Sequence, residues 1–260
     1  MRKITDDVTT NILKEQFVPD NVFIYVASGK IKVFDGLHSY IFKKGDACLA
    51  RKNRLAKYKI LDSSEAFFPI IFCFDEVFLQ EFQQKKQPSI SESSISNSFI
   101  EVPASELINS FITSIQPYYK GVMQLDTDFE HLKYEELLLI LLKIQPSLSS
   151  VLFDYRKPGK IDIEKFMHKN YTFNVSISYF AHLTGRSLSA FKRDFKEVFN
   201  ETPGKWLTQR RLEEAHFYIE NKKLKPSDFY LDLGFESLSH FSISFKKKYG
   251  YTPSTLYQKL

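Results

Sequence analysis

The sequence contains few cysteines and no long hydrophobic run. Among its 260 residues only Cys48 and Cys73 are cysteines, and neither belongs to a CxxC pair. Isolated thiols in apolar, strand-like surroundings are typical of buried free cysteines in a reducing compartment, not of a disulfide framework. Residues 1–16 lack an apolar signal core, and the longest aliphatic run, residues 137–142, is far too short to cross a bilayer. We therefore expect a cytoplasmic protein without a membrane partner.

The residue patterns of enzymes are also missing. A metal site in a small β-barrel needs several histidines and a glutamate from neighbouring strands, yet residues 21–74 contain one histidine, His38. The sequence has no HExxH motif, no phosphate-binding glycine loop and no Ser-His-Asp signature. We expect a protein that is not an enzyme and uses no cofactor or metal. A metal enzyme built on the barrel is the alternative, which a bound metal would support.

The chain carries a basic excess, and this excess lies in its C-terminal part. The formal net charge is +5. Residues 160–260 contain 17 basic and 11 acidic residues, whereas residues 1–159 contain 19 and 20. A basic surface attracts phosphate backbones, but many proteins that bind no nucleic acid carry a similar surplus. The charge therefore permits a nucleic-acid partner without establishing one.

Short strand-like segments separated by turns fill residues 21–74. Residues 22–26 and 31–34 flank a Ser-Gly turn, and the Asp35-Gly36 and Lys44-Gly45-Asp46 segments are further turn signals. Such spacing predicts a small antiparallel barrel or sandwich. Aromatic residues in this region could line a ligand pocket, although filling the core is their commoner use. They are Tyr25, Phe34, Tyr40, Phe42, Tyr58 and Phe72.

Two amphipathic helices are predicted after this region, at residues 105–119 and 129–144, beyond a polar loop at residues 83–97. The second helix has more apolar residues than one core-facing stripe needs. Burial against both the barrel and a second subunit explains the excess, and burial within its own domain is the alternative. The Ser- and Pro-Gly-containing residues 146–160 predict a boundary between a domain at 1–150 and another at 160–260.

Two similar segments lie fifty residues apart in the C-terminal part. SLSAF at residues 187–191 is matched by SLSHF at residues 237–241, and each is followed by a Phe-Lys pair and a Thr-Pro pair. A glycine, Gly185 or Gly234, precedes each copy and can take the positive φ that a tight turn requires. A glycine turn between two short helices builds a helix-turn-helix, so two copies predict two DNA-reading units.

Each predicted second helix has an apolar face and a polar face. In residues 187–199, Leu188, Phe191, Phe195 and Phe199 are expected to be buried. Leu238, Phe241, Phe245 and Tyr249 repeat this spacing and are expected to be buried as well. Lysine and arginine on the opposite face can donate to guanine in the major groove, and ordinary solvated charges are the alternative. The candidate DNA contacts on the two helices are Ser189, Lys192, Arg193 and Lys196, then Ser239, Ser242, Lys246 and Lys247.

A continuous helix is predicted between the two units, from Pro203 to residue 219. At about 1.5 Å per residue it spans about 24 Å. A stiff connector of that length can hold two reading helices in successive major grooves, about 34 Å apart. Upstream of the first unit, Ser176 is expected to cap the supporting helix.

The sequence TPGKWLTQRRLEEA, followed by LGFESLSHFSISFKKKYGYTPS, resembles the DNA-binding domain of the AraC/XylS family of bacterial transcription regulators. The resemblance extends from near Asp162 to the C-terminus. It implies that residues 187–199 and 238–249 are recognition helices, and that Arg210 is the linker-helix arginine, with a structural or phosphate-contacting role. It also implies base contacts from Ser189, Lys192, Arg193, Ser239 and Ser242.

The N-terminal half resembles the cupin-like regulatory barrel of the same family, in which the segment KGD at residues 44–46 matches a recurrent turn. LKYEELLLILL resembles the dimerisation helix of members that answer to a protein partner, such as the type III secretion activator ExsA. The resemblance implies an α+β fold: a cupin-like antiparallel β-barrel followed by helices, then an all-α domain with two helix-turn-helix units joined by a linker helix. It implies a homodimeric activator that binds double-stranded promoter DNA and RNA polymerase. A small-molecule or protein effector would regulate it.

The second unit departs from the first at three positions. Tyr230 replaces the small Ala181, Lys225 replaces the capping serine, and Ile243 replaces Arg193. We therefore expect the second unit to read bases less and to grip phosphates through Lys246 and the two lysines that follow it. A small-molecule sensor or repressor of the same fold is the alternative function. Arg51, Lys52 and Arg54 could anchor an acidic ligand or partner, or simply be solvated.

Overall fold

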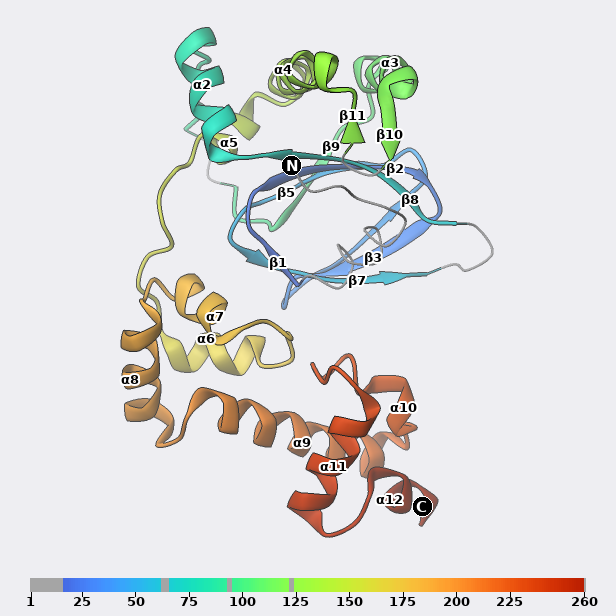
Figure 1. The fold of residues 1–260 in the computed structure, drawn as a ribbon, viewed down its shortest axis with the longest axis vertical. Coiled ribbons are helices and arrows are strands. Elements are labelled where there is room, and N and C mark those ends of the chain that lie inside the picture. Colours follow the sequence, from blue (N-terminus) through green and yellow to red (C-terminus); the bar gives the residue numbers. More distant parts are fainter. Residues whose placement is uncertain (1–15, 62–65, 93–94, 122–123, 260) are drawn as a thin grey trace. The chain divides into compact units, whose positions relative to one another are not determined.

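The computed structural model describes residues 16–61, 66–92, 95–121 and 124–259. The chain divides into two compact units, residues 1–156 and 157–260. The first unit combines antiparallel sheets with helices, and the described part of the second forms helices joined by turns (Figure 1). The predicted α+β class, with antiparallel sheets in the N-terminal half and a helical C-terminal domain, is confirmed.

The first unit is built around two antiparallel sheets. In the described residues, one sheet has the strand order β8-β2-β5-β9 and the other has the order β4-β3-β7. Strand β2 is central in the first sheet, where Ile24 lies opposite both Cys48 and Ile71. The strands of the two sheets are β2 (Asn21–Ser28), β3 (Lys30–Phe34), β4 (Ser39–Lys43), β5 (Ala47–Ala50), β7 (Lys57–Ile60), β8 (Phe68–Phe74) and β9 (Phe99–Val102). Two short pairs complete them: β1 (Phe17–Val18) with β6 (Arg54–Leu55), and β10 (Tyr119–Gly121) with β11 (Gln124–Leu125).

The four-stranded sheet is apolar on both faces because side chains alternate along each strand. On one face Val26 and Cys48 pack with Ile31, Val33 and Phe42 of the other sheet. The opposite face packs against helices in a second cluster that includes Phe23, Leu49, Phe72, Phe111 and Leu138. The first unit is therefore layered, with one core between the sheets and another beneath the helices.

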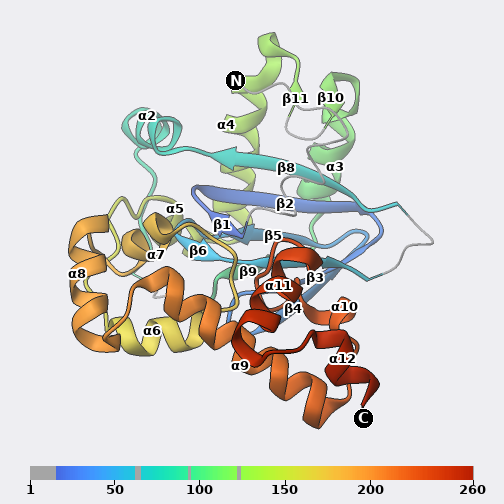
Figure 2. The ribbon, with the colours of Figure 1, turned by 60° about the horizontal axis from the view of Figure 1, so that its bottom comes forward.

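Three main helices cover the outer face of this sheet. They are α2 (Glu76–Lys86), α3 (Glu106–Ile115) and α4 (Thr127–Ile144), followed by the short α5 (Ser149–Leu152). Figure 2 shows α3 and α4 on the same side of β8 and β2. Each of the three main helices begins at a side-chain cap, Asp75, Ser105 or Asp126, as helix N-termini favour. The predicted polar loop at 83–97 begins later than expected, because α2 continues through Lys86.

Helix α4 is only partly buried in its own unit. Leu137, Leu138 and Leu141 are fully buried, whereas Leu132 is 62% exposed and Leu139 is 46% exposed. The alternative of a helix buried wholly within its own domain is therefore wrong for the chain by itself. Neither α4 nor any other helix in the described ranges is long and apolar enough to span a membrane.

The second unit contains the two predicted helix-turn-helix motifs. Helices α7 and α8 form the first, α10 and α11 form the second, and α9 joins them. The supporting helix of the second motif, α10, is only four residues long, against seven for α7. The helices are α6 (Ile163–Asn170), α7 (Ile177–Leu183), α8 (Leu188–Phe199), α9 (Pro203–Lys222), α10 (Pro226–Phe229), α11 (Leu238–Tyr249) and α12 (Pro253–Gln258).

Two details of the predicted helices are wrong. Leu188 and Leu238 were expected to be buried, but each is 40% exposed, because each is the first residue of its helix and lies beyond the packed phenylalanines. Ser176 stands at the start of α7 but caps no backbone amide. Its hydroxyl lies 2.7 Å from that of Ser178 instead, so the side chain is turned toward a neighbouring hydroxyl.

Candidate nucleic-acid interface

Helix α8 is held by phenylalanines and by a tight turn. Phe191 and Phe195 are fully buried, and their spacing places them on one side of the helix. Gly185, in the turn before α8, has φ +67°, a conformation that L-residues avoid. A Cβ at this glycine would lie 2.5 Å from the backbone of Gly159. The turn therefore requires glycine for both its conformation and its close packing.

The predicted contact residues of α8 lie on its free face. Ser189, Lys192, Arg193 and Lys196 are all exposed, whereas Phe191 and Phe195 on the other side are buried. The structure thus brings these four side chains together on one surface of one helix. That surface carries three cations in two turns, a density suited to a phosphate-lined groove.

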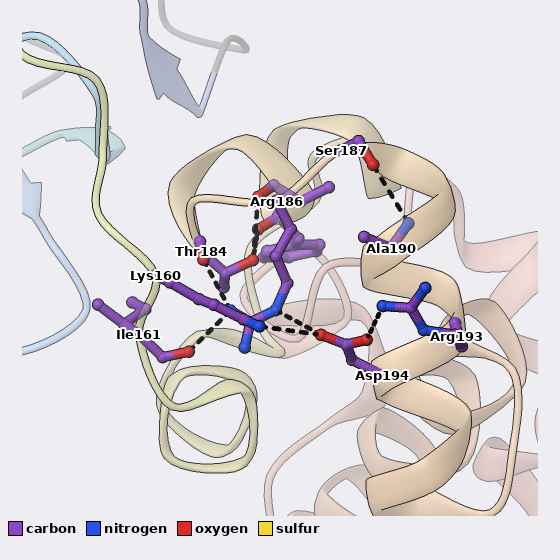
Figure 3. A network of polar contacts seen from close by, with 10 residues as sticks. Lys160, Ile161, Thr184, Arg186, Ser187, Ala190, Arg193 and Asp194 are labelled. Carbon is purple, nitrogen blue, oxygen red and sulfur yellow. Dashed lines mark hydrogen bonds and ion pairs between the residues drawn. The ribbon is translucent and has the colours of Figure 1, made fainter.

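Arg193 is aligned by a neighbouring carboxylate (Figure 3). Its Nη2 lies 2.9 Å from Oδ1 of Asp194, and its side chain is 69% exposed. The other oxygen of Asp194 accepts a bond from Nε of Arg186 at 3.0 Å, and Lys160 Nζ lies 4.0 Å away. Hydrogen bonds from Arg186 and Arg193 lower the pKa of Asp194. The carboxylate therefore stays charged and orients Arg193 while leaving most of its guanidinium free.

Arg186 anchors this arrangement to the turn. Besides Asp194, its Nη1 donates to the carbonyls of Thr184 at 2.7 Å and Ile161 at 2.8 Å. Its side chain is nearly buried. Sequence reasoning missed both Arg186 and Asp194. Their separation of eight residues, across a turn and a helix start, follows no helical spacing rule that would have paired them.

Helix α11 presents a different surface at equivalent positions. Ser239, Lys246 and Lys247 are exposed and Ser242 is half-buried, while Ile243 is 69% exposed. The third lysine of this run has acceptors within the protein. Lys248 Nζ lies 2.9 Å from a carboxylate oxygen of Glu213 and 3.2 Å from the carbonyl of Gln209. Lys248 therefore ties α11 to α9.

The adjacent arginines of α9 have different environments. Arg210 lies 3.7 Å from carboxylate oxygens of both Glu213 and Glu214, and its guanidinium stacks 5.0 Å from the centre of the Tyr171 ring. These contacts hold Arg210 along the helix and leave about a third of its side chain exposed. Its predicted role, structural or phosphate-contacting, is compatible with this partial exposure.

Arg211 joins three segments of the C-terminal unit, residues 157–260, and the sequence did not single it out. Nε donates to the carbonyl of Tyr171, Nη2 to that of Phe173 and Nη1 to that of Gly234, each at 2.8 Å. Burial lowers the pKa of Arg211 to about 10, so it remains charged at neutral pH. A Cβ at Gly234 would lie 2.8 Å from its guanidinium carbon. The arginine thus joins the linker helix, the segment before α7 and the second turn.

Helix α11 is fixed to α9 by aromatic and polar contacts as well. The ring of His216 lies 4.5 Å from that of Tyr249, and Nε2 is 3.0 Å from the hydroxyl of Tyr251. Its Nδ1 is 3.1 Å from Glu220.

Helix α9 has 20 residues, and at about 1.5 Å per residue it is about 30 Å long. It is longer than predicted, because it continues to Lys222.

The first unit encloses an apolar cavity of about 280 Å³ between its two sheets. Of the aromatic residues that could line a pocket, Phe42 and Tyr58 do so. Tyr25 and Phe72 instead pack in the cluster beneath the helices, because alternation puts them on the other face of the sheet. Other lining residues are Val22, Ile24, Val33, Ala50 and both cysteines.

The cysteines are free thiols, as predicted. Burial raises the pKa of Cys73 to about 12, and it raises that of Cys48 as well, so neither is a reactive thiolate at neutral pH. The ranges that the structure describes contain no group of three or more His, Cys, Asp or Glu residues placed to hold a metal.

Comparison with known proteins identifies both units. The ExsA N-terminal regulatory domain matches residues 21–151, and a helix-turn-helix domain model matches residues 180–259. The chain is 34% identical over 126 residues to the virulence regulon transcriptional activator VirF of Yersinia enterocolitica, covering 47% of this chain and 46% of VirF. It is 33% identical over 125 residues to the regulator ExsA of Pseudomonas aeruginosa, covering 47% and 45%.

These alignments span about half the length of the curated relatives. Among solved structures, apo ToxT from Vibrio cholerae is 16% identical, with a TM-score of 0.42 over 94% of this chain and 90% of ToxT. The family models cover both halves of the chain, and the regulatory-domain model alone matches half of it. The chain belongs to the AraC family of transcriptional regulators, in the group that carries the ExsA N-terminal regulatory domain.

Proposed function

We propose that the protein is a sequence-specific DNA-binding transcriptional activator, working on promoter DNA in the cytoplasm. The observation that carries the proposal is the surface of α8, where exposed Lys192 and Arg193 stand on a helix fixed from behind by buried phenylalanines. The names of the Yersinia and Pseudomonas relatives, a virulence regulon activator and a helix-turn-helix regulator, support the same function. As an activator it would also contact RNA polymerase.

Each contact residue takes a role that follows from its chemistry. Arg193 would donate two hydrogen bonds to guanine O6 and N7, and Ser189 and Lys192 would read neighbouring base edges. Lys196 and Arg210 would hold phosphates beside the first groove. In the second unit, Ser239 and Ser242 would face bases, and Lys246 and Lys247 would neutralise phosphates.

The linker helix supports binding to one face of the DNA. Helix α9 runs without a break from the end of the first motif to the start of the second, over about 30 Å. The first recognition helix adjoins the start of α9, and α11 is tied to its middle through Glu213 and His216. Both recognition helices are therefore fixed to the same linker helix, so they would enter adjacent grooves together.

Replacement of Arg193 tests the proposal most directly. DNA duplexes are first selected from a random library by the full chain. At one guanine of the selected site, Arg193→Ala should lose about 1–3 kcal/mol of binding free energy relative to wild type. Arg186 still holds Asp194 in this variant, so the helix itself should not move. Gel shifts at fixed salt measure the change.

Lys247→Ala is the matched control. It should weaken binding to all sequences alike and lower the salt dependence of log K by about 1. Unchanged base preference for Arg193→Ala would show that α8 does not read bases through this face.

The exposed leucines of α4 support a homodimer and a regulatory role for residues 1–150. Leu132 and Leu139 are seven residues apart, about two helical turns, and therefore share a face. A symmetric partner helix laid on this face would bury both. Leu139→Asp should convert the dimer to a monomer in sedimentation experiments, whereas Val77→Asp on α2, at a similarly exposed position, should not.

The apolar cavity supports a second candidate, a sensor or repressor of the same fold. A lined space of about 280 Å³ is near the lower limit for small-molecule sites and suits a compact apolar effector. Native mass spectrometry of the purified protein separates this from control by a protein antagonist. A retained small molecule supports the sensor, and a stable protein partner supports antagonism.

A further inference from the structure

The recognition surface of α11 contains an exposed isoleucine. Ile243 is 69% exposed, more than any other large hydrophobic side chain in the part of the chain that the structure describes. Single exposed apolar residues are common on protein surfaces. Exposure alone therefore does not distinguish Ile243, and its position and neighbours decide its role.

The position of Ile243 matches that of Arg193 in α8. Each lies four residues after the exposed serine of its recognition helix, Ser189 or Ser239. On the turn after Ile243, Lys246 and Lys247 are exposed, at spacings of three and four residues that place them beside it. The apolar side chain is thus flanked by hydroxyls on one side and cations on the other.

Buried packing does not account for this residue. The packed face of α11 consists of Phe241 and Phe245, both fully buried, and Ile243 lies on the opposite face. A β-branched side chain on an exposed helix face loses side-chain freedom and gains little from the helix itself. Local stability therefore supplies no reason for isoleucine at this place.

The chemistry of the major groove does supply a reason. Guanine and adenine offer hydrogen-bonding atoms there, whereas thymine also offers its C5-methyl group, which apolar side chains contact. We propose that Ile243 reads the C5-methyl of a thymine, which adds an apolar base contact to those of Ser239 and Ser242. The inference rests on the proposed function and deepens it.

This assignment changes what the second unit is expected to recognise. A DNA site for this protein would have two chemically different parts about one helical turn apart. The part under α8 would contain a guanine bound by Arg193, and the part under α11 would contain a thymine in van der Waals contact with Ile243. Lys246 and Lys247 would bind the adjacent phosphates and so set how deeply α11 enters the major groove.

Replacing thymine by deoxyuridine tests the contact because it removes the methyl group alone. Duplexes are selected from a random library by the full chain, and each thymine is then replaced singly. Wild type should bind about fourfold more weakly at one thymine, the equivalent of one methyl-sized apolar contact. Ile243→Ala should bind the thymine and uracil duplexes equally, and Ile243→Val should retain part of the difference.

Val198→Ala is the matched truncation, on the other recognition helix. Val198 is exposed but lies nine residues after Ser189, two and a half helical turns, and so faces away from the reading surface. This variant should keep the full preference for thymine.

Two outcomes would overturn the inference: wild type indifferent to every uracil replacement, or Ile243→Ala keeping the thymine preference. If the guanine preference of Arg193 survives in those cases, the proposed function stands and only the role of Ile243 falls. If the full chain selects no sequence at all, both fall.

Discussion

The two helix-turn-helix units have the same buried scaffold but are anchored differently. In the first, a seven-residue supporting helix is followed by Gly185 and Arg186, and Arg186 is bonded to Asp194 within the same unit. In the second, the supporting helix has four residues, and Gly234 is followed by the buried Phe235. The first unit thus carries its own polar anchor, and the second does not.

The second unit is held instead by side chains of the linker helix. Arg211 binds the Gly234 carbonyl, Glu213 pairs with Lys248, and His216 packs on Tyr249. One sequence repeat therefore specifies one helix geometry through two different sets of polar contacts. Damage to α9 at Glu213 or His216 should therefore affect the second motif more than the first.

The largest effect is expected from Arg211→Met. This change leaves three carbonyls, those of Tyr171, Phe173 and Gly234, without their donor. We expect a loss of about 3 kcal/mol in the free energy of unfolding of the C-terminal unit. The single tryptophan, Trp206, lies in α9, so urea unfolding followed by its fluorescence reports on this unit.

The neighbouring Arg210→Met is the control for that measurement. Its ion pairs are partly exposed, so the expected loss is below about 1 kcal/mol. Equal effects of the two substitutions would contradict the role of Arg211 as the anchor of the second unit.

A smaller difference is expected between two glycines with similar backbone angles. Gly185 and Gly250 both have positive φ, but a Cβ at Gly185 would overlap the Gly159 backbone at 2.5 Å, while nothing lies within 4 Å of one at Gly250. Gly250→Ala should cost about 1 kcal/mol, from its backbone angle alone. Gly185→Ala should cost about 2 kcal/mol more, because the backbone must also move. Unfolding midpoints in urea compare the two, and equal costs would show that the first turn is loosely packed.

The smallest effect is a pH dependence of the unfolding free energy that comes from the first helix-turn-helix motif. The pKa of Asp194 is lowered in the folded protein by Arg186 and Arg193, so its ionised form favours folding above the usual carboxyl pKa of about 3.8. This contribution is lost as the pH falls through the lower folded pKa. The difference in unfolding free energy between wild type and Asp194→Asn should therefore be constant near neutral pH and shrink below about pH 3.8.

Ser244 occupies the corresponding position in α11, so Ser244→Ala should show no such pH dependence. A difference between wild type and Asp194→Asn that stays undiminished as the pH falls well below 3.8 would mean that the charge of Asp194 is not what stabilises the turn.

Short-range patterns were sufficient for most of the helical unit. The bounds of α11 agree with the predicted range, and α8 begins one residue late only because Ser187 is its cap. Phe191 and Phe195 are buried as their spacing predicts. In the N-terminal unit, residues 1–156, the turn at Gly45 and the strands on either side of it also follow the local pattern.

Errors arose where a side chain had several neighbours within reach. Ser176 bonds to Ser178 instead of capping α7, and the pairing of Lys248 with Glu213 was not predicted. For Tyr25 and Phe72 the favoured interpretation, core packing, is confirmed, but the sequence did not say which face of the sheet meets the other sheet. The roles assigned to the recognition-face residues remain predictions.

The sequence by itself determined the elements and their family, because helical periodicity, caps and glycine turns depend on residues a few positions apart. Only the tertiary structure decided how the units are anchored. Arg211 reaches a carbonyl 40 residues away in the chain, and Arg186 reaches one 25 residues away. Every backbone carbonyl is an equivalent acceptor in the sequence, and packing alone selects which of them a buried guanidinium meets.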